Sequence, residues 1–284
     1  MRSLPVIAVT FGMMCAPWAI LSAADANSQL DALLKTFVDE FVEIRPGADK
    51  FPATFSMGSA EGSPAETPPQ QVTLKTSFWI AKYEVPQNLY EAVTGKNPSR
   101  WKGPRNSVEM MSWRDSVQFC ETATALLRER QWLGADEVIR LPTELEWEYC
   151  CRAGTSTRYS FGDAIRRETD VGKRNSILDE YGWYTGNAAG NDPPVGALKP
   201  NPWGLYDMHG YLWEFTADAW TPTLTERIKG PPQPVGGEKD ALITLRGGSW
   251  KDPAERLTSF ARRSLSVTAA DDAVGLRCVR AKVP

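Results

Sequence analysis

The stretch from residue 245 to residue 280 constrains the fold of this chain more than any other. Its glycine pair, Gly247-Gly248, is flanked by Ile243, Leu245 and Trp250, a pattern typical of a strand that runs into a tight turn. The same stretch is rich in arginine: Arg246, Arg256, Arg262, Arg263, Arg277 and Arg280. We therefore expect a strand-to-turn element that concentrates positive charge in a chain that is acidic overall.

The composition limits what the chain can do. Its 284 residues carry a formal net charge of −3 and give a pI of about 5.5, which does not favour nucleic acid as a partner. The 11 Trp, 21 Pro and 22 Gly are typical of a loop-rich fold held by aromatic side chains. The single histidine, His209, excludes three-histidine iron centres, two-histidine copper centres and most imidazole-based catalytic relays.

The N-terminus has the pattern of a secretory signal peptide over residues 1–24. A short basic start precedes an apolar run from Leu4 to Leu21, which ends at the small residues Ser22-Ala23-Ala24. Pro17 interrupts the run, which favours a cleaved signal over a permanent anchor. We therefore expect a Sec-exported protein in the periplasm, with no transmembrane anchor after cleavage.

The remaining chain divides into residues 25–50, an N-terminal amphipathic helix and linker, and residues 51–284, one domain without internal repeats. Apolar residues fall at helical spacing between Ser28 and Val42, and Arg45-Pro46-Gly47 then stops the helix. Ser112 is expected to cap a second helix that ends near Arg130.

The segment Arg140 to Tyr149 (RLPTELEWEY) is the most specific local motif. Thr143 and Glu146 form a capping box, which predicts a helix that begins there. Glu144 and Glu148 lie one turn apart on the same face. A carboxylate pair can be catalytic, but first-turn dipole compensation and ion pairing are the favoured interpretation.

These motifs together resemble the formylglycine-generating-enzyme (sulfatase-modifying factor) superfamily, from about Phe51 to Arg280. The resemblance implies an α+β, C-type-lectin-like fold that is loop-rich, with little regular secondary structure. In formylglycine generators, a cysteine pair near this Arg-Gly-Gly-Ser-Trp motif binds copper. This chain has no cysteine between Trp250 and Arg277, and Asp252 and either Glu255 or Leu257 stand nearest those positions. We therefore expect no formylglycine-generating oxidase, and we find no copper, flavin or haem motif.

The resemblance also implies a ligand-binding groove where the family has its reactive centre. The expected groove residues are Trp213, Ser249, Trp250, Asp252, Glu255 and Arg256. By the same resemblance, Arg263 and Arg277 are expected to anchor buried carboxylates such as Glu214 or Asp207. Arg256 and Arg262 are candidates for holding an anionic ligand.

Four further expectations follow from family positions. One structural calcium is expected at Asn187 with Asp192, the alternative being a loop held by Asn side-chain turns. Cys120 and Cys278 are expected to form a disulfide in an oxidising compartment. The neighbouring cysteines at positions 150 and 151 are expected to be free, and His209 to be structural rather than catalytic.

Across its whole length the chain is similar to superfamily members that mature the siderophore pyoverdine in the periplasm. This resemblance implies oxidation of the dihydropyoverdine chromophore, with a peptide-like siderophore precursor as partner. The alternative is a non-enzymatic interaction module that binds a periplasmic protein, similar to superfamily members that regulate type VI secretion. The missing cysteine pair favours the alternative, whereas Ser249 and Trp250 do not discriminate.

Overall fold

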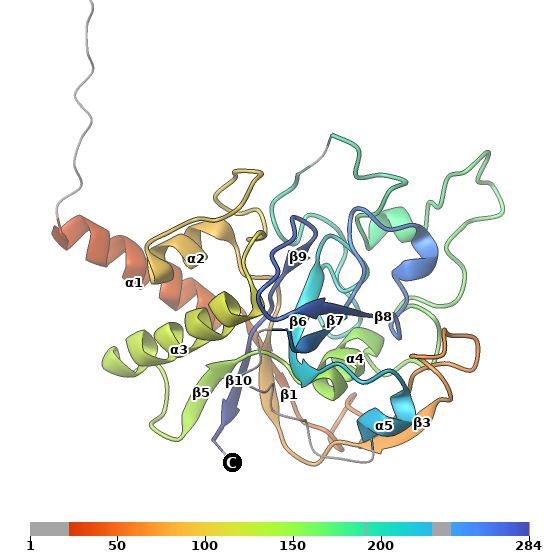
Figure 1. The fold of residues 1–284 in the computed structure, drawn as a ribbon, viewed down its shortest axis with the longest axis horizontal. Coiled ribbons are helices and arrows are strands. Elements are labelled where there is room, and N and C mark those ends of the chain that lie inside the picture. The colour runs from red at the N-terminus through yellow and green to blue at the C-terminus, as the bar shows by residue number, and fades with distance from the viewer. Residues whose placement is uncertain (1–22, 191, 229–239, 284) are drawn as a thin grey trace, which may run out of the picture.

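A computed structural model describes residues 23–190, 192–228 and 240–283 (Figure 1). The predicted signal peptide, residues 1–24, lies outside the described residues except for its last two positions. Within the described ranges, no helix is long and apolar enough to span a bilayer.

A four-stranded antiparallel sheet contains the first and the last strand of the described residues. Its strands lie in the order β1 (Phe41–Ile44), β4 (Phe78–Ala81), β10 (Val279–Lys282) and β5 (Glu137–Arg140). Val279 pairs with Ile80 on one side and with Arg140 on the other. The C-terminal strand is therefore an interior strand of the sheet (Figure 1).

Each face of this sheet packs against different elements. Helices α1 (Ala23–Asp39), α2 (Gln87–Thr94) and α3 (Trp113–Glu129) lie together on one side (Figure 1). On that side Phe37 and Phe119 share a core cluster with Cys278. The next residue, Val279, belongs to a second cluster with Trp147. This alternation follows from the strand repeat, in which successive side chains point to opposite faces.

The N-terminal helix ends earlier than its periodicity predicts. We expected it to reach Val42, but it ends at Asp39, and Phe41 already begins strand β1. Val42 pairs with Ile80 of β4, so long-range strand pairing replaces the last helical turn. Residues 25–50 therefore contribute a helix and a sheet strand to the same structure as residues 51–284.

A second sheet carries the glycine turn. Its order is β8 (Arg262–Ser266), β7 (Leu242–Arg246), β6 (Trp213–Ala219) and β9 (Val274–Gly275). As expected, β7 runs into a turn: Gly247 and Gly248 have φ of +106° and +78°, values that L side chains rarely adopt. Smaller elements are β2 (Thr54–Met57), β3 (Gln70–Thr73), α4 (Glu144–Arg152), α5 (Leu224–Ile228) and the 3₁₀ turns η1 (Leu178–Glu180) and η2 (Ala254–Arg256). Long loops join them, and the predicted loop-rich α+β class is confirmed.

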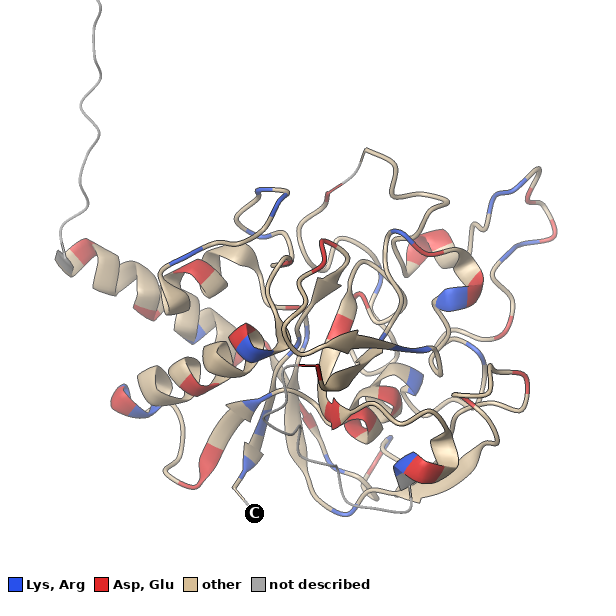
Figure 2. Ribbon diagram, viewed as in Figure 1, with Lys and Arg blue, Asp and Glu red and all other residues tan. Residues whose placement is uncertain are grey.

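Helix α4 is rich in acidic residues (red in Figure 2), and Glu144 and Glu148 are fully buried. Its predicted capping box is present, because Thr143 Oγ1 accepts from the Glu146 N–H and the Glu146 carboxylate accepts from the Thr143 N–H. Glu144 is fully buried and pairs with Arg262, with 2.5 Å between Oε1 and Nε. Glu148 pairs with Arg246 and with Arg152. The predicted ion-pairing role of Glu144 and Glu148 is confirmed.

Other arginines differ from expectation. Arg277 does anchor Glu214, with 2.7 Å between Nη2 and Oε1 and both side chains fully buried. Arg263 does not anchor a buried carboxylate, since it is 41% exposed and reaches Asp271 at 3.5 Å. The Arg262 side chain, a candidate for ligand binding, is fully buried beside Glu144. These two neighbours in β8 have opposite roles because successive strand residues face opposite sides.

Candidate functional site: an aromatic cavity

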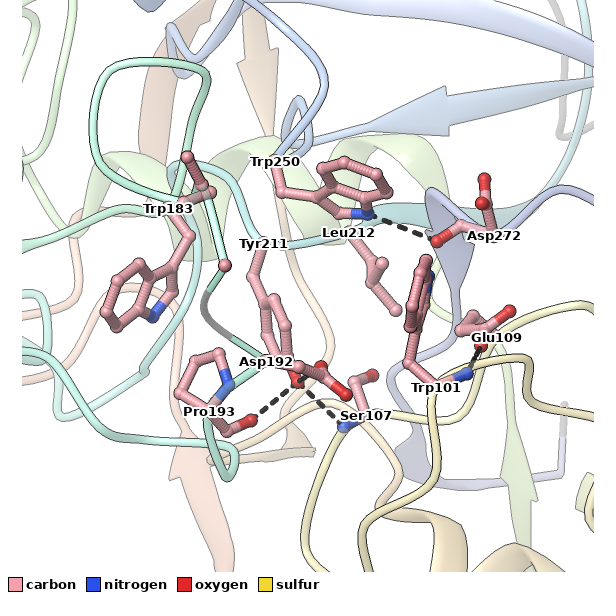
Figure 3. A pocket seen from close by; sticks show the side chains of 13 residues that line it. Trp101, Ser107, Glu109, Trp183, Asp192, Pro193, Tyr211, Leu212, Trp250 and Asp272 are labelled. Atoms are coloured by element: carbon pink, nitrogen blue, oxygen red, sulfur yellow. Dashed lines mark hydrogen bonds between the residues drawn. The ribbon is translucent and has the colours of Figure 1, made fainter.

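A cavity of about 310 Å³ opens where four loops meet (Figure 3). The α2–α3 loop supplies Trp101, Ser107 and Glu109, and the loop after η1 supplies Trp183, Asp192 and Pro193. Tyr211 and Leu212 precede β6, Trp250 follows β7, and Asp272 precedes β9. The cavity therefore joins segments that are far apart in the sequence.

The backbone at the edge of the second sheet positions the aromatic wall. The Trp250 N–H donates to the Tyr211 carbonyl at 2.9 Å, and the Tyr211 N–H donates to the Trp183 carbonyl at 3.0 Å. The turn at Gly248 brings its Cα so close to the Arg256 carbonyl that a Cβ would lie 2.8 Å from that oxygen. The glycine is thus required for the approach that places Trp250 beside Tyr211.

Tyr211 closes the floor of the cavity. Its hydroxyl donates to the Pro193 carbonyl at 2.7 Å and accepts from the Ser107 N–H at 3.2 Å (Figure 3). Burial raises the pKa of the Tyr211 phenol, and the nearby Glu84 and Asp192 raise it further. The phenol therefore stays neutral and ties the loops together.

Glu109 is the most buried acid that lines the cavity. Its side chain accepts from the backbone N–H groups of Arg100 and Trp101 through Oε1. Its other oxygen, Oε2, has no partner among the described residues, although the residue is only 3% exposed. Burial raises the pKa of Glu109, against the effect of the two N–H groups.

Asp272 has a different electrostatic setting. It pairs with Lys251 through Oδ1 and with Arg100 through Oδ2, the latter at 3.3 Å. Burial opposes ionisation, but the Lys251 ammonium outweighs it and lowers the pKa of Asp272. This carboxylate is therefore neutralised by protein cations, whereas Glu109 is not.

Three lining residues carry buried polar atoms without a partner in the described part of the chain: Ser107 Oγ, Glu109 Oε2 and Trp183 Nε1. An unsatisfied buried polar atom costs about 1–3 kcal/mol. Three of the ten such atoms among the described residues line this one cavity, where a ligand or a water molecule can reach them.

The structure brings only one of the six predicted groove residues to this cavity, Trp250. Asp252 instead accepts from the Trp213 indole N–H at 2.8 Å and from the Ser249 hydroxyl at 2.5 Å, so these three hold one another. Glu255 and Arg256 are exposed on η2 and do not line the cavity.

Sequence reasoning missed most of the lining residues, among them Trp101, Glu109, Trp183 and Asp272. The segments that contain the first three were matched to the family as part of its pattern, without a role for any side chain. A tryptophan in each of these loops was the available signal, because an exposed loop rarely needs several large aromatic residues. Trp101 is 47% exposed at the cavity lip.

Comparisons with known proteins show the family of the chain. The sulfatase-modifying factor enzyme 1-like domain matches residues 33–282. The chain belongs to this family. It is 30% identical to the formylglycine-generating enzyme of Thermomonospora curvata, over 63% of this chain and 55% of that protein. It is 28% identical to the mouse enzyme, over 84% of this chain and 60% of that protein. The chain thus spans little more than half the length of these two relatives.

A solved structure is similar to this chain along most of its length. The structure of PvdO from Pseudomonas aeruginosa superposes with a TM-score of 0.66 at 25% identity, covering 85% of this chain and 94% of that one. The family membership confirms the resemblance expected from the Arg-Gly-Gly-Ser-Trp motif and the segment Arg140 to Tyr149.

The copper that the family resemblance implies does not fit this member. The cysteines of the described residues are Cys120, Cys150, Cys151 and Cys278; all are buried, and none lines the cavity. Copper(I) takes soft sulfur ligands, whereas the cavity offers carboxylates, indoles and hydroxyls. No step of the chemistry proposed below passes through copper.

The predicted calcium ligands serve as hydrogen-bonding groups in this family member. Asn187 Oδ1 accepts from the Tyr184 N–H at 3.0 Å, and its Nδ2 donates to the Gly182 carbonyl at 2.9 Å. Asp192 accepts from Asn106 Nδ2 at 2.6 Å, and its Oδ1 lies 3.3 Å from the Tyr211 hydroxyl oxygen. The described residues contain no group of three or more His, Cys, Asp or Glu suited to a metal. As placed, Asn187 and Asp192 do not fit a calcium cage, and calcium binding stays a prediction.

The predicted disulfide is not formed in this structure. The sulfurs of Cys120 and Cys278 lie 3.9 Å apart, longer than the roughly 2.05 Å of an S–S bond. The two thiols are nevertheless neighbours in the core between α3 and the first sheet. The disulfide stays a prediction, as does the free state of Cys150 and Cys151 in the mature protein.

His209 lies in the core rather than at the cavity. Its Nδ1 contacts the Leu257 carbonyl at 2.8 Å, and its Nε2 accepts from the Ser160 N–H at 3.0 Å, which assigns the proton to Nδ1. Burial lowers the pKa of His209 to about 4, so the imidazole is neutral at physiological pH. These contacts support the expected structural role.

Proposed function

We propose that the aromatic cavity binds the flat chromophore of a peptide siderophore precursor, and that the protein acts in maturation of that siderophore by oxidising dihydropyoverdine to pyoverdine. The observation that carries the proposal is the cavity, with indole walls and unpartnered polar atoms on Ser107, Glu109 and Trp183. The similarity to PvdO supports it, since the whole-chain resemblance to pyoverdine-maturation proteins pointed to the same function.

The cavity suits a flat ring better than an extended chain. Indole and phenol rings from Trp101, Trp183, Trp250 and Tyr211 supply apolar surface for stacking. Its volume of about 310 Å³ is at the lower end for ligand sites, so it accommodates a head group and leaves an attached peptide outside.

The proposed reaction is a two-electron oxidation. The dihydro ring loses two hydrogen atoms, that is, two electrons and two protons, and a carbon–carbon double bond forms in the ring. Dioxygen accepts the two electrons and the two protons and becomes hydrogen peroxide. The contribution of this chain is to orient the ring between indoles and to limit its contact with water. We place the reaction in the periplasm, in line with the signal-peptide pattern of residues 1–24.

A binding module is the second candidate function. The chain is 29% identical to a mouse relative named inactive C-alpha-formylglycine-generating enzyme 2, and 28% identical to a Paenibacillus barcinonensis relative named chaperone protein LppX. The absence of a thiol from the described cavity lining is consistent with such a role, in which the ligand would belong to a periplasmic protein.

A deletion strain separates these two functions. Mass spectrometry of the secreted peptides should show dihydropyoverdine in the deletion strain and pyoverdine after complementation with the unaltered gene. Complementation with Glu109→Gln should leave the dihydro form, while Arg256→Ala, an exposed residue outside the cavity, should restore pyoverdine. Mature pyoverdine in the deletion strain itself would refute the enzymatic proposal and favour the binding module.

A further inference from the structure

The cavity lining carries more negative than positive charge. Its lining includes three carboxylates, Glu109, Asp192 and Asp272, and no Lys or Arg among the described lining residues. Lys251 and Arg100 approach from outside the lining, and both bind Asp272.

Glu109 and Asp192 are left without a cationic partner among the described residues. Asp192, at the exposed rim of the cavity, accepts from Asn106 and lies beside the Tyr211 hydroxyl, and both neighbours are neutral. Glu109 accepts only from backbone N–H groups, and its Oε2 is buried without a partner. A cationic N–H donor stabilises an ionised carboxylate more than a neutral donor does, because it adds the attraction of opposite charges to the hydrogen bond.

The aromatic walls favour the same ligand charge. The face of an indole carries negative electrostatic potential and attracts cations, and Trp is the strongest of the aromatic residues in this respect. Two protein cations already use such faces nearby: Arg100 lies 5.1 Å from the Trp101 ring centroid and Lys251 lies 5.1 Å from that of Trp250. The inner cavity thus offers both a free carboxylate oxygen and electron-rich walls.

The ligand must also carry an acceptor. Trp183 Nε1 is a donor only, and it has no partner in the described structure. Ser107 Oγ, which can donate or accept, has no partner at normal hydrogen-bond distance, although the buried Glu84 carboxylate lies beside it. A flat ring with a hydroxyl or carbonyl at one edge and cationic N–H groups at another would satisfy these atoms together with Glu109.

We propose that the cavity selects a planar cation, an aromatic ring that bears an amidinium or guanidinium group, over neutral or anionic rings of the same shape. Glu109 pairs with the cationic N–H groups, and the indoles cover the ring faces. This inference rests on the site of the proposed function and names the class of ligand that the site accepts.

Benzamidine, benzamide and benzoate test this selection, because they share one ring and differ in charge. Isothermal titration calorimetry with the mature protein should show benzamidine binding at least about tenfold more tightly than benzamide, and no binding of benzoate. A tenfold ratio corresponds to about 1.4 kcal/mol, at the lower end of what a hydrogen bond to a charged group contributes. Equal or weaker binding of benzamidine relative to benzamide would overturn the inference.

The variants Glu109→Gln and Glu255→Gln are matched, since each replaces one acid with its amide. Glu109→Gln keeps the acceptor for the Arg100 and Trp101 N–H groups. It should weaken benzamidine binding about tenfold and change benzamide binding less than about threefold. Glu255→Gln, on the exposed η2 turn, should change neither. Unchanged benzamidine binding in Glu109→Gln with a native circular dichroism spectrum would refute the pairing.

The experiments distinguish a failure of the cation-selection inference from a failure of the proposed oxidation. Selective benzamidine binding by a protein that does not restore pyoverdine would leave the cation site standing and refute the oxidation. Restored pyoverdine with no preference for benzamidine would leave the oxidation standing and refute cation selection. If Glu109→Gln does not fold, Asp192→Asn at the rim provides the second test, with a smaller expected loss of benzamidine affinity of about threefold.

Discussion

Replacing His209 with Asn should change how the stability of the protein depends on pH. The pKa of His209 is about 4 in the folded protein, against 6.5 for the ordinary side chain, because the imidazole is fully buried. As pH falls below 6.5, the unfolded chain binds a proton that the folded protein does not bind until about pH 4. Stability is therefore lost as pH falls through this window. The difference amounts to roughly 2 kcal/mol between pH 7 and pH 5.

Several buried acids, among them Asp207 and Asp218, act in the opposite direction. Burial raises the pKa of Asp207 and of Asp218 to about 6, so each favours the folded state at lower pH. Both remain in the variant, and their effect cancels when the two proteins are compared. Urea unfolding of each protein at pH 7 and at pH 5 gives the comparison. The wild type should lose roughly 2 kcal/mol more than His209→Asn over this interval. Parallel losses would show that His209 is not held neutral and would refute the reasoning.

Three further predictions follow from the described contacts. Arg262→Ala removes a positive charge that pairs with the buried Glu144, and it should lower the free energy of unfolding by about 3–5 kcal/mol in a denaturant titration. In the same titration, the exposed Arg263→Ala should lower it by less than about 0.5 kcal/mol. Gly182→Ala would place a Cβ 1.9 Å from the His209 carbonyl oxygen and should abolish cooperative thermal unfolding; a sharp transition at the wild-type temperature would contradict this clash. The protein should form no aldehyde from a sulfatase-type cysteine peptide, with or without copper, because no thiol lines the described cavity; hydrazide capture above the no-enzyme background would disprove this.

Much of the fold could be predicted because its signals are local. The capping box at Thr143 and Glu146 involves residues three apart, and its geometry follows from backbone donors of the first helical turn. The turn at Gly247-Gly248 is likewise encoded by the backbone freedom of two residues. By contrast, the helical periodicity wrongly predicts that Val42 is helical. Its pairing with Ile80 involves a distant segment, about which local periodicity carries no information.

The site could be predicted only in part for a related reason. Family position located the loop after β7, but it did not show that Asp252 turns back to Trp213 and Ser249. The residues that do form the cavity with Trp250 come from other loops. Glu109 and Asp272 are 163 residues apart in the chain, and only the tertiary structure brings them to one cavity.

The rate of chromophore oxidation by the purified mature protein tests the central claim most directly. Dihydropyoverdine in air-saturated buffer should become fluorescent pyoverdine faster with the protein than without it, and hydrogen peroxide should accumulate in equal amount. Trp183→Phe, which removes the unpartnered indole N–H, and Glu109→Gln should each slow the reaction about tenfold or more. Arg256→Ala should react at the wild-type rate. If both cavity variants match the wild type, or if the protein does not accelerate the reaction, the cavity is not the site of this chemistry.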